Sequence, residues 1–579
     1  MLKSHHYLLA TACAALVGAA AYAPGASAAT CNGQTNCSLG LTAYTFGSND
    51  IFGAGSSLVA PYFRQTADCY ANPADLIFSG SPPTFADETL FDYTGSPPLN
   101  CATTHIVSGK TAWYISTGSG TGIKGVFAHD PTLFGDVNKG NPTQQFPEVH
   151  YGLSDAALAQ SDVNVYASGG SEQGLTFGTP GQYPCGNAAP NYANPQQCFG
   201  PLIQFPFSID PVAFAYNPVY EQILNGNGSI STYSFHVKKP RADGSGGLRL
   251  SPLTYCLIFN GQITNWNDSH ITADNGGKSL ADPNDPNKAH FSVPLIPVGR
   301  SDSSGTTFII TRHLYSVCQG LAGVNNLYTV GGETTLQAAG ATSIIGNTYS
   351  LSNPNFPGVD QAGKFTLAPG SNGIAQYVAF TASPVGQTSN CTVPAGAQVC
   401  ITQGRIAYIG PDYVLPYVNS TNTNPYGLNS ATVENQSGQW EEPTPAGAAK
   451  AFSVLSAPTG ANAADPANWV QGGTSTILGD PSISGAYPIV GTTNFLGYTC
   501  YAQSGATTTI TKLLNFVNNA KTNWNTKGGI LATAGLSPLP ASWRSAIQGD
   551  FVTNSSGLGL NISTVGAAGT CSTAGIVGG

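Results

Sequence analysis

Residues 298–308, VGRSDSSGTTF, lie at the junction of an apolar run, a polar glycine-containing stretch and a second apolar run. The apolar run 291–298 precedes them, and the β-branched run Phe308–Thr311 follows them. This order is typical of a buried strand, a glycine-containing polar loop and the start of a helix. Apolar β-branched runs also alternate with helix-like segments elsewhere in the chain, so we expect an α/β fold.

The same loop has the chemistry of an anion site. Its serines, glycine and threonines offer hydroxyls and free backbone N–H groups at the positive end of a helix, and Arg300 precedes these donors. This combination suits an oxyanion such as phosphate. Charged residues make up only 8% of the chain, against about 25% in ordinary globular proteins. A cluster that contains Arg300 and Asp302 therefore stands out from its surroundings.

The first 28 residues predict a secretory signal peptide. Lys3 is the only charged residue among them, residues 7–21 are apolar apart from one threonine, and residues 26–28 form an A-x-A cleavage pattern. We expect cleavage after residue 28 or 29. A membrane anchor is the weaker alternative, because the apolar run is short and Pro24 interrupts it. We therefore expect a periplasmic or secreted protein with no transmembrane anchor.

Cysteine usage agrees with export. Loss of Cys13 with the signal peptide leaves 12 of the 13 cysteines, and an even number in an exported chain indicates disulfides. The candidate pairs, whose connectivity the sequence does not fix, are Cys31/Cys37, Cys185/Cys198, Cys391/Cys400, Cys69/Cys101, Cys256/Cys318 and Cys500/Cys571. No C-x-x-C or H-E-x-x-H motif occurs and the histidines are scattered, so we expect no metal and no cofactor.

The charge balance is acidic, with 20 Lys and Arg against 29 Asp and Glu. Such a chain is a poor nucleic-acid binder, and local donors must hold any anion. Stretches rich in Gly, Pro, Asn and Ser are predicted as loop insertions at residues 135–148, 168–204, 225–247, 383–403 and 419–445. Two helices are predicted near the C-terminus, at Thr507–Trp524 and Pro540–Phe551.

Three further polar loops have the same character. Residues 53–62 read GAGSSLVAPY, residues 114–122 read YISTGSGTG, and residues 151–158 read YGLSDAAL. A Gly/Ser-rich turn is usually only a turn, so each alone is a weak signal. Together with residues 298–308, their order and content indicate one family.

This set of motifs resembles the phosphate-binding proteins of ABC-type phosphate uptake systems. That family has the motifs G-A-G-S/T-S/T-F-x-x-P, G-S-S/G-x-G, G-x-S-D-A-x-L and R-x-D-x-S-G-T. This chain has all four in order, with Leu58 in place of the phenylalanine. Weaker matches occur at residues 207–217, 263–268, 405–410 and 487–489, so the resemblance spans nearly the whole mature chain. Family members are much shorter, and the insertions are the main departure.

The resemblance implies an α/β, two-lobe periplasmic binding protein fold of type II, with a hinge and loop-rich insertions. The implied division is signal peptide 1–28, first lobe 29–212 and 489–579, and second lobe 213–488. The chain would pass between the lobes near residues 205–217 and 487–493. The resemblance further implies a monomer that closes over its ligand.

The resemblance also implies a set of residues that bind phosphate. The implied residues are Ser57, Leu58, Ser119, Asp155, Arg300, Ser304, Gly305 and Thr306. The second of these would act through its backbone N–H, and Asp302 would orient the guanidinium. Neutral donors and one arginine can replace the water shell of a buried dianion. The alternatives are that Asp155 caps a helix, that Arg300 forms only a structural ion pair, and that residues 304–306 form only an N-cap.

Asp155 is unusual, because a carboxylate repels an anion. It is useful only where the ligand carries a hydrogen, as phosphate does at neutral pH and sulfate does not. Sulfate would leave Asp155 facing a like charge without a donor, at a cost of roughly 2–5 kcal/mol. The residue would therefore select phosphate over sulfate.

The function implied by the resemblance is capture of inorganic phosphate and its delivery to a membrane permease of an ABC transporter, without catalysis. Two alternatives remain open. A secreted hydrolase is one, because residues 302–305 faintly resemble the nucleophile region of serine proteases, although no G-x-S-x-G elbow and no recognisable catalytic histidine occur. A surface or scaffold protein built on a phosphate-binding core is the other, because the insertions are large and nearly uncharged.

Overall fold

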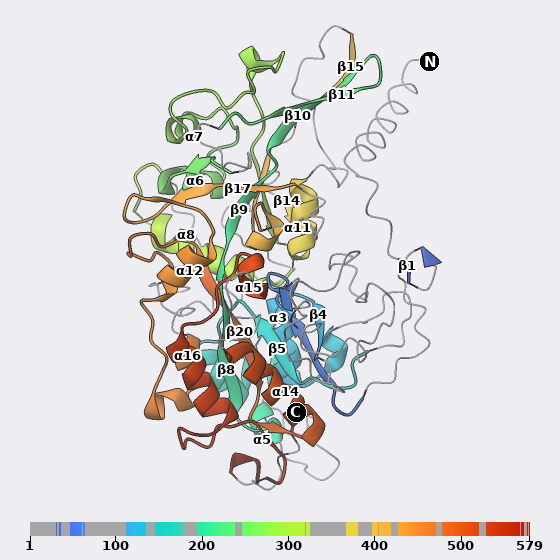
Figure 1. Ribbon diagram of the computed structural model, residues 1–579, viewed down its shortest axis with the longest axis vertical. Helices are drawn as coiled ribbons and strands as arrows, with labels where there is room; N and C mark the ends of the chain where they lie inside the picture. Colours follow the sequence, from blue (N-terminus) through green and yellow to red (C-terminus); the bar gives the residue numbers. More distant parts are fainter. Residues whose placement is uncertain are drawn as a thin grey trace.

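The computed structural model describes residues 30–31, 34–35, 47–60, 62–63, 66, 112–134, 145–172, 174–177, 194–237, 246–300, 302–318, 320–324, 366–379, 396–402, 404–417, 427–470, 478–519, 529–567, 569–572, 576 and 578–579. The predicted signal peptide lies outside these residues. Figure 1 shows two α/β bodies, one above the other along the long axis, with the C-terminus at the lower one.

The lower body is built on a five-stranded sheet with the order β4-β3-β5-β20-β8. Its strands are β3 (Ile51–Gly55), β4 (Ala112–Ser116), β5 (Tyr151–Ser154), β8 (Leu202–Pro211) and β20 (Val490–Tyr498). β3 pairs in parallel with β4 and β5, whereas β20 runs antiparallel to β5 and β8. All residues of β3, β5, β8 and β20 are buried, because helices cover the sheet.

The upper body has a second five-stranded sheet with the order β14-β13-β16-β9-β17. Its strands are β9 (Ala213–Tyr216), β13 (Ile296–Arg300), β14 (Thr366–Ala368), β16 (Arg405–Ile409) and β17 (Asn429–Ser430). Alternation along β9 separates its two faces. Ala213 and Ala215 pack in the small core with α11, whereas Phe214 stacks on Phe259 of α6 with ring centroids 4.7 Å apart. Helices therefore cover both faces of this sheet as well.

The chain passes between the two sheets at two places. β8 ends at Pro211 and β9 of the other sheet begins at Ala213. The return to the first sheet is complete at Val490, where β20 begins. The lobe boundaries expected from the sequence, 212/213 and 488/489, lie beside these positions, and the division of the chain into lobes at those residues stays a prediction.

The described helices surround these sheets. They are α3 (Ser119–Ala128), α4 (Gln160–Ser168), α5 (Pro195–Phe199), α6 (Pro252–Phe259), α7 (Ser269–Asp274), α8 (Gly305–Cys318), α11 (Gly370–Val378), α12 (Pro445–Phe452), α14 (Ser504–Asn518), α15 (Ile530–Thr533) and α16 (Ala541–Ile547). Short turns of helix are η2 (Pro131–Phe134), η5 (Pro411–Tyr413), η7 (Pro466–Val470) and the π-helical η8 (Gln548–Val552).

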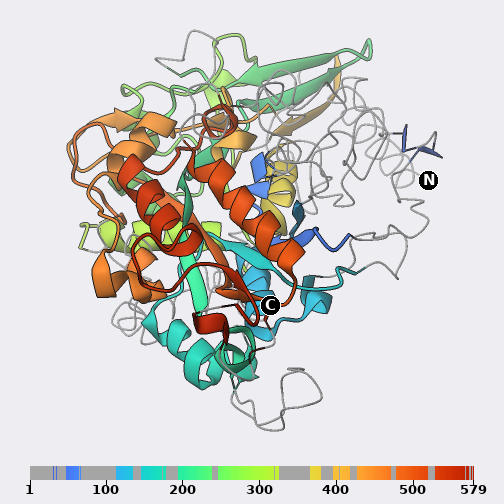
Figure 2. The same ribbon diagram turned by 60° about the horizontal axis from the view of Figure 1, so that its bottom comes forward.

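The two C-terminal helices were expected from the sequence. α14 begins three residues before the predicted Thr507 and its described part ends at Asn518. Its buried face includes Ile510, Leu513 and Val517, which lie at helical spacing. α16 continues into η8, so together they occupy nearly the predicted range. Figure 2 shows these helices side by side in front of the first lobe.

Four of the five predicted loop insertions, at residues 168–204, 225–247, 383–403 and 419–445, contain strands instead. β10 (Val219–Asn225) pairs with β11 (Ile230–Ser234) and β15 (Ala397–Thr402), and these strands project from the end of the upper lobe (Figure 1). The polar residues between β10 and β11 form a tight hairpin turn in which Gly228 has φ 82°. Such a turn resembles a loop in composition, although it joins two paired strands.

The smaller sheets are β12 (Arg249–Leu250) with β18 (Thr432–Glu434) and β19 (Trp440–Glu441), β6 (Gly170–Glu172) with β7 (Leu175–Phe177), β1 (Thr30–Cys31) with β2 (Gln34–Thr35), and β21 (Cys500–Tyr501) with β22 (Ser563–Thr564).

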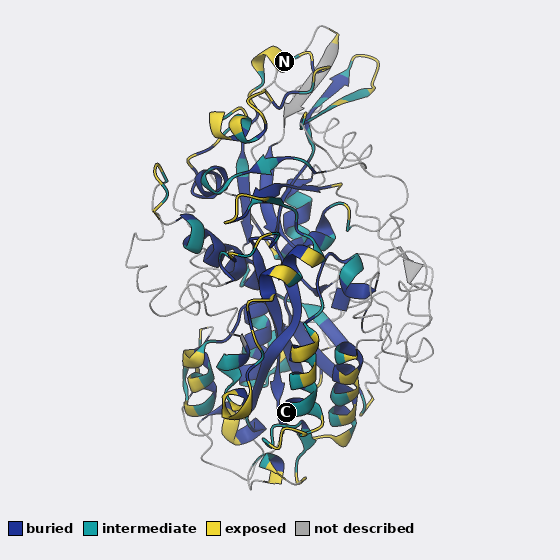
Figure 3. Cartoon of the chain, turned by 60° about the vertical axis from the view of Figure 1, so that its left-hand side comes forward, coloured by how far each residue is buried: buried dark blue, intermediate teal, exposed yellow. Residues whose placement is uncertain are grey.

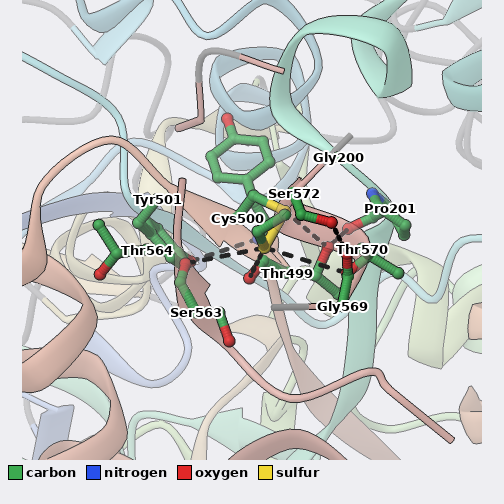
Figure 4. Close-up of a disulfide and its surroundings, with 12 residues drawn as sticks. Gly200, Pro201, Thr499, Cys500, Tyr501, Ser563, Thr564, Gly569, Thr570 and Ser572 are labelled. Atoms are coloured by element: carbon green, nitrogen blue, oxygen red, sulfur yellow. Dashed lines mark hydrogen bonds between the residues drawn. A yellow bond between two sulfur atoms is a disulfide. The ribbon is translucent and has the colours of Figure 1, made fainter. Parts of the chain in front are cut away.

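Burial and disulfides agree with an exported globular protein. Figure 3 shows buried strands along the centre of both lobes and exposed residues on the outer helices. Two of the candidate disulfides are confirmed, Cys256–Cys318 and Cys500–Cys571; the second joins β21 to the C-terminal segment (Figure 4). In each of the other four candidate pairs, at least one side chain lies outside the described part. Among the described helices, none is both long enough and apolar enough to cross a bilayer.

Candidate functional site

Four of the predicted loops follow the carboxyl ends of strands. Ser57 follows β3, Ser119 follows β4 and begins α3, and Asp155 follows β5. Because these strands are parallel neighbours, their loops emerge at one edge of the first sheet. The fourth loop joins β13 to α8 in the other lobe. The predicted strand–loop–helix order of residues 298–308 is therefore present.

The loops of the two lobes meet at this edge. Gly120 N–H donates to the carbonyl of Ser303 at 3.2 Å. A Cβ atom on Gly305 would lie 2.5 Å from Ser119 Oγ and 2.7 Å from Asp155 Cβ, so no larger residue fits there without displacement. The start of α8 thus lies directly against the first lobe.

Arg300 is a buried cation held by one acid. Its Nε donates to Asp302 Oδ1 at 2.6 Å, its Nη2 contacts the second oxygen of the same carboxylate, and its side chain is 2% exposed. Burial would lower the pKa of Arg300, but the Asp302 carboxylate more than offsets this and raises it. Asp302 also accepts from the N–H of Gly370, the first residue of α11, at 2.8 Å. The expected ion pair and its orienting role are consistent with this geometry.

Asp155 is buried and receives hydroxyl donors from both lobes. Thr493 Oγ1 lies 2.7 Å from its Oδ1, and Thr306 Oγ1 donates to its Oδ2 at 3.3 Å. Burial raises the pKa of Asp155, while hydrogen bonds from Ser56 and from these two threonines, together with the charge of Arg300, act in the opposite direction. Asp155 and Arg300 are therefore close enough to interact, as sharing one small ion requires.

The other predicted donors make bonds within the cluster. Ser57 Oγ accepts from the N–H of Ser371 at 3.2 Å, and Ser119 Oγ accepts from Asp155 N–H at 3.2 Å. Leu58 N–H, expected to face a ligand, donates to Ser56 Oγ at 3.1 Å, within its own turn.

The start of α8 adds a helix cap to the cluster. Ser304 Oγ accepts from Thr307 N–H at 3.3 Å, as an N-cap does. The N-cap reading of residues 304–306 therefore describes part of their role, and it is compatible with anion binding.

The structure adds residues that the sequence did not single out. Ser371 lies in the first turn of α11, Thr493 in β20 and Asp210 in β8. Asp412, in η5, is a further acid, and neither of its oxygens accepts a hydrogen bond from another described residue. Burial raises the pKa of Asp412 well above its ordinary value. Asp210 was inside a segment that resembled the family, but nothing in the sequence indicated that its carboxyl approaches Asp155.

The arrangement can hold a small anion by neutral donors and one guanidinium. Within the described part of the chain, no group of three or more His, Cys, Asp or Glu side chains is placed to hold a metal ion. The donors come from both lobes, so a ligand here would join them. Together the fold and the cluster define a two-lobed binding protein.

Comparison with known families agrees with this class. The model of the PBP superfamily domain matches residues 40–521, so the chain belongs to the PBP superfamily. Alkaline phosphatase L of Pseudomonas aeruginosa strain UCBPP-PA14 is 26% identical over 468 residues, which cover 79% of this chain and 88% of that protein. A phosphate-binding protein of an unknown prokaryotic organism is 24% identical over 467 residues, which cover 80% and 94%.

Solved structures confirm the two-lobe fold. A high-affinity periplasmic phosphate-binding protein bound with phosphate superposes with a TM-score of 0.51 at 21% identity, over 91% of this chain and 98% of that chain. The phosphate-binding protein of Stenotrophomonas maltophilia gives a TM-score of 0.51 at 22% identity, with the same coverage. These similarities concern the architecture.

Proposed function

We propose that this chain is an exported protein that captures inorganic phosphate between its lobes. The observation that carries the proposal is the buried cluster in which Arg300 of one lobe lies near Asp155 of the other, surrounded by hydroxyl and amide groups. A guanidinium attracts the anion, the neutral donors replace its water, and the acid accepts its hydrogen. Relatives and structural neighbours that are named phosphate-binding proteins support this choice of anion.

The proposed ligand contacts follow the four loops. They come from Ser57, Leu58, Ser119, Asp155, Arg300, Ser304, Gly305 and Thr306, with Asp302 holding the guanidinium in place. Entry of phosphate would exchange bonds such as Thr306–Asp155 for bonds to phosphate oxygens. Such an exchange changes the free energy little per bond, so affinity depends on the arginine and on pre-arranged donors.

Calorimetric titration of the phosphate-stripped protein with phosphate, arsenate and sulfate tests the proposal. We expect phosphate to bind and Arg300→Ala to weaken it by about 100-fold or more, because a charge-assisted bidentate contact is lost. Arg249→Ala is the matched control, because Arg249 lies over the Trp440 ring, 4.9 Å from its centroid, outside the cluster. Near-normal phosphate binding by Arg300→Ala would refute the site.

Phosphate-ester hydrolysis is a second candidate function, because relatives at 26% identity are named alkaline phosphatase L. Release of p-nitrophenol from p-nitrophenyl phosphate measures it directly. Turnover that is lost in Ser119→Ala while phosphate still binds would favour the enzyme. If the protein only binds phosphate, the rate of p-nitrophenol release should equal the uncatalysed rate in wild type and in every variant of the cluster.

Export and delivery complete the proposal. We infer that the chain acts in the periplasm or outside the cell, and that a membrane permease of an ABC transporter receives its phosphate. The predicted signal peptide and the two disulfides support export. Deletion of the gene should reduce cellular phosphate uptake at low external phosphate, whereas a purely structural surface protein would leave uptake unchanged.

A further inference from the structure

A second acid lies directly behind the proposed anion site. Thr493 of β20 lies between two buried carboxyls, with its Oγ1 2.7 Å from Asp155 Oδ1 and 2.6 Å from Asp210 Oδ2. The strands that carry or precede these residues, β5, β20 and β8, are neighbours in one sheet. The arrangement therefore belongs to a single lobe and does not depend on contact between lobes.

Counting hydrogens indicates a proton on one of these two acids. A threonine hydroxyl has one hydrogen, so Thr493 can donate to only one carboxyl. If both carboxyls were ionised, its other contact would bring two oxygens with lone pairs together, with no hydrogen between them, inside a buried cluster. A proton on one acid removes this conflict, because that acid then donates to Thr493.

The surroundings place that proton on Asp210. The Arg300 guanidinium and the hydroxyl of Thr306 both favour the ionised form of Asp155. Asp210 has no such cation. Burial and the charge of Asp155 raise its pKa to about 7, although hydrogen bonds from Thr493 and Ser208 act in the opposite direction.

Two further titratable groups face this pair of acids. Tyr62 OH lies 2.7 Å from Ser208 Oγ, which donates to Asp210 Oδ1 at 2.7 Å. Asp412 of η5, the other titratable group, interacts electrostatically with both acids. Neither supplies a positive charge, so both leave Asp210 in its protonated form.

We propose that Asp210 is a positioning residue that holds a proton and, through Thr493, keeps Asp155 as an ionised acceptor for the hydrogen of phosphate. This inference rests on the proposed function. Asp210 Oδ2–H donates to Thr493 Oγ1, and the threonine hydroxyl donates to Asp155 Oδ1. Asp155 Oδ2, which accepts from Thr306 in the ligand-free protein, then accepts the hydrogen of phosphate when the ligand enters. Sulfate, which has no hydrogen, gains nothing from an acceptor held in this way.

The main test compares wild type with Asp210→Asn, whose amide can donate to Thr493 as the protonated acid does but cannot ionise. Phosphate affinity is measured by calorimetry at pH 5.5, 7 and 8.5. The ionisation of phosphate itself cancels in the ratio of the two Kd values at each pH. We expect the two proteins to agree at pH 5.5, and wild type to bind roughly tenfold more weakly at pH 8.5, because Asp210 then adds a second negative charge.

Asp162→Asn serves as the control, because Asp162 is an equally buried acid of the same lobe that caps α4. It should follow wild type at every pH. A ratio of wild-type to Asp210→Asn Kd that stays constant from pH 5.5 to 8.5 would overturn the proposal.

The threonine provides an independent test that does not need an Asp210 variant to fold. Thr493→Val removes the hydroxyl at nearly constant volume, and Thr493→Ser restores it. We expect the valine variant to lose at least tenfold of the preference for phosphate over sulfate, and the serine variant to recover it. A valine variant with the wild-type preference would contradict the relay, whereas a purely structural role would alter stability without changing the preference.

Ligand-free unfolding separates this inference from the proposed function. The raised pKa of Asp210 in the folded protein means that its favourable contribution is fully present below its ordinary value of 3.8 and is lost as the pH rises through about 7. The free energy of unfolding of wild type should therefore fall relative to Asp210→Asn over that interval. Absence of phosphate binding by every protein would refute the function, and equal pH slopes would refute the proton on Asp210 even if phosphate binds.

Discussion

At the scale of single residues, the cluster combines the two opposite charges that the proposed protonated anion would need. Arg300 is paired with Asp302, so it attracts an anion without being an isolated buried charge. Asp155 is instead surrounded by hydroxyls that stabilise its ionised form. An acid in this environment accepts a hydrogen from a ligand, and it penalises a ligand that has none.

Asp155→Asn should therefore reduce selectivity more than it reduces stability. An amide can donate to sulfate and no longer repels it, so we expect the ratio of sulfate to phosphate Kd to fall by about 30-fold, equivalent to roughly 2 kcal/mol. Calorimetry with both anions at pH 7 measures the ratio, and Asp162→Asn is again the control. An unchanged ratio would rule out hydrogen recognition by Asp155.

At the scale of elements, the parallel strands β3, β4 and β5 bring three of the site loops to one edge of a sheet. Gly305 allows the fourth loop, at the start of α8, to approach them closely. The start of α8 can reach Ser119 and Asp155 because Gly305 has no Cβ. The loop of Arg300 is also fixed to α11 through Gly370, so two helix starts of the upper lobe contribute to one cluster.

Gly305→Ala should separate binding from folding. Its Cβ would meet Ser119 Oγ and backbone or Cβ atoms of the other lobe at 2.5–2.7 Å, which holds the lobes apart while each core stays intact. We expect phosphate affinity to fall by about 100-fold, with the midpoint of urea unfolding nearly unchanged. Gly549→Ala, whose Cβ would have only the hydroxyl of Ser555 at 3.1 Å, controls for the added methyl group. Wild-type affinity in Gly305→Ala would show that this close approach is not needed for binding.

At the scale of the whole molecule, a ligand held by both lobes should stabilise the protein as a unit. Saturation at 100 times Kd adds about 2.7 kcal/mol to the free energy of unfolding. We expect phosphate to raise Tm in differential scanning calorimetry and sulfate at the same concentration to raise it far less. Arg300→Ala should abolish the difference. A phosphate-dependent shift that survives in Arg300→Ala would place the bound anion elsewhere.

Local sequence predicted several short-range features of this chain correctly. The strand–loop–helix order around Arg300 and the ion pair with Asp302 were expected from short motifs. Cysteine parity indicated disulfides, but the sequence offered Cys256–Cys318 and Cys500–Cys571 only as candidate pairs, which the structure confirms. Helix ends were less accurate, as α14 shows, because packing and capping decide where a periodic pattern stops. The hairpin of β10 and β11 was missed because its turn has the composition of a loop.

Which side chains meet across the chain could not be read from local patterns. Thr493 and Asp210 are separated by 283 residues, and their contact exists because β20 and β8 pair antiparallel in one sheet. Ser57 and Ser371 meet because the loop after β3 in one lobe lies against the start of α11 in the other. The sequence motifs identify which chemical groups are present, because the residue type fixes whether a side chain carries a hydroxyl, an amide or a charge. The positions of these groups, and hence the proton that we propose on Asp210, follow from strand order and burial, which are properties of the folded chain as a whole.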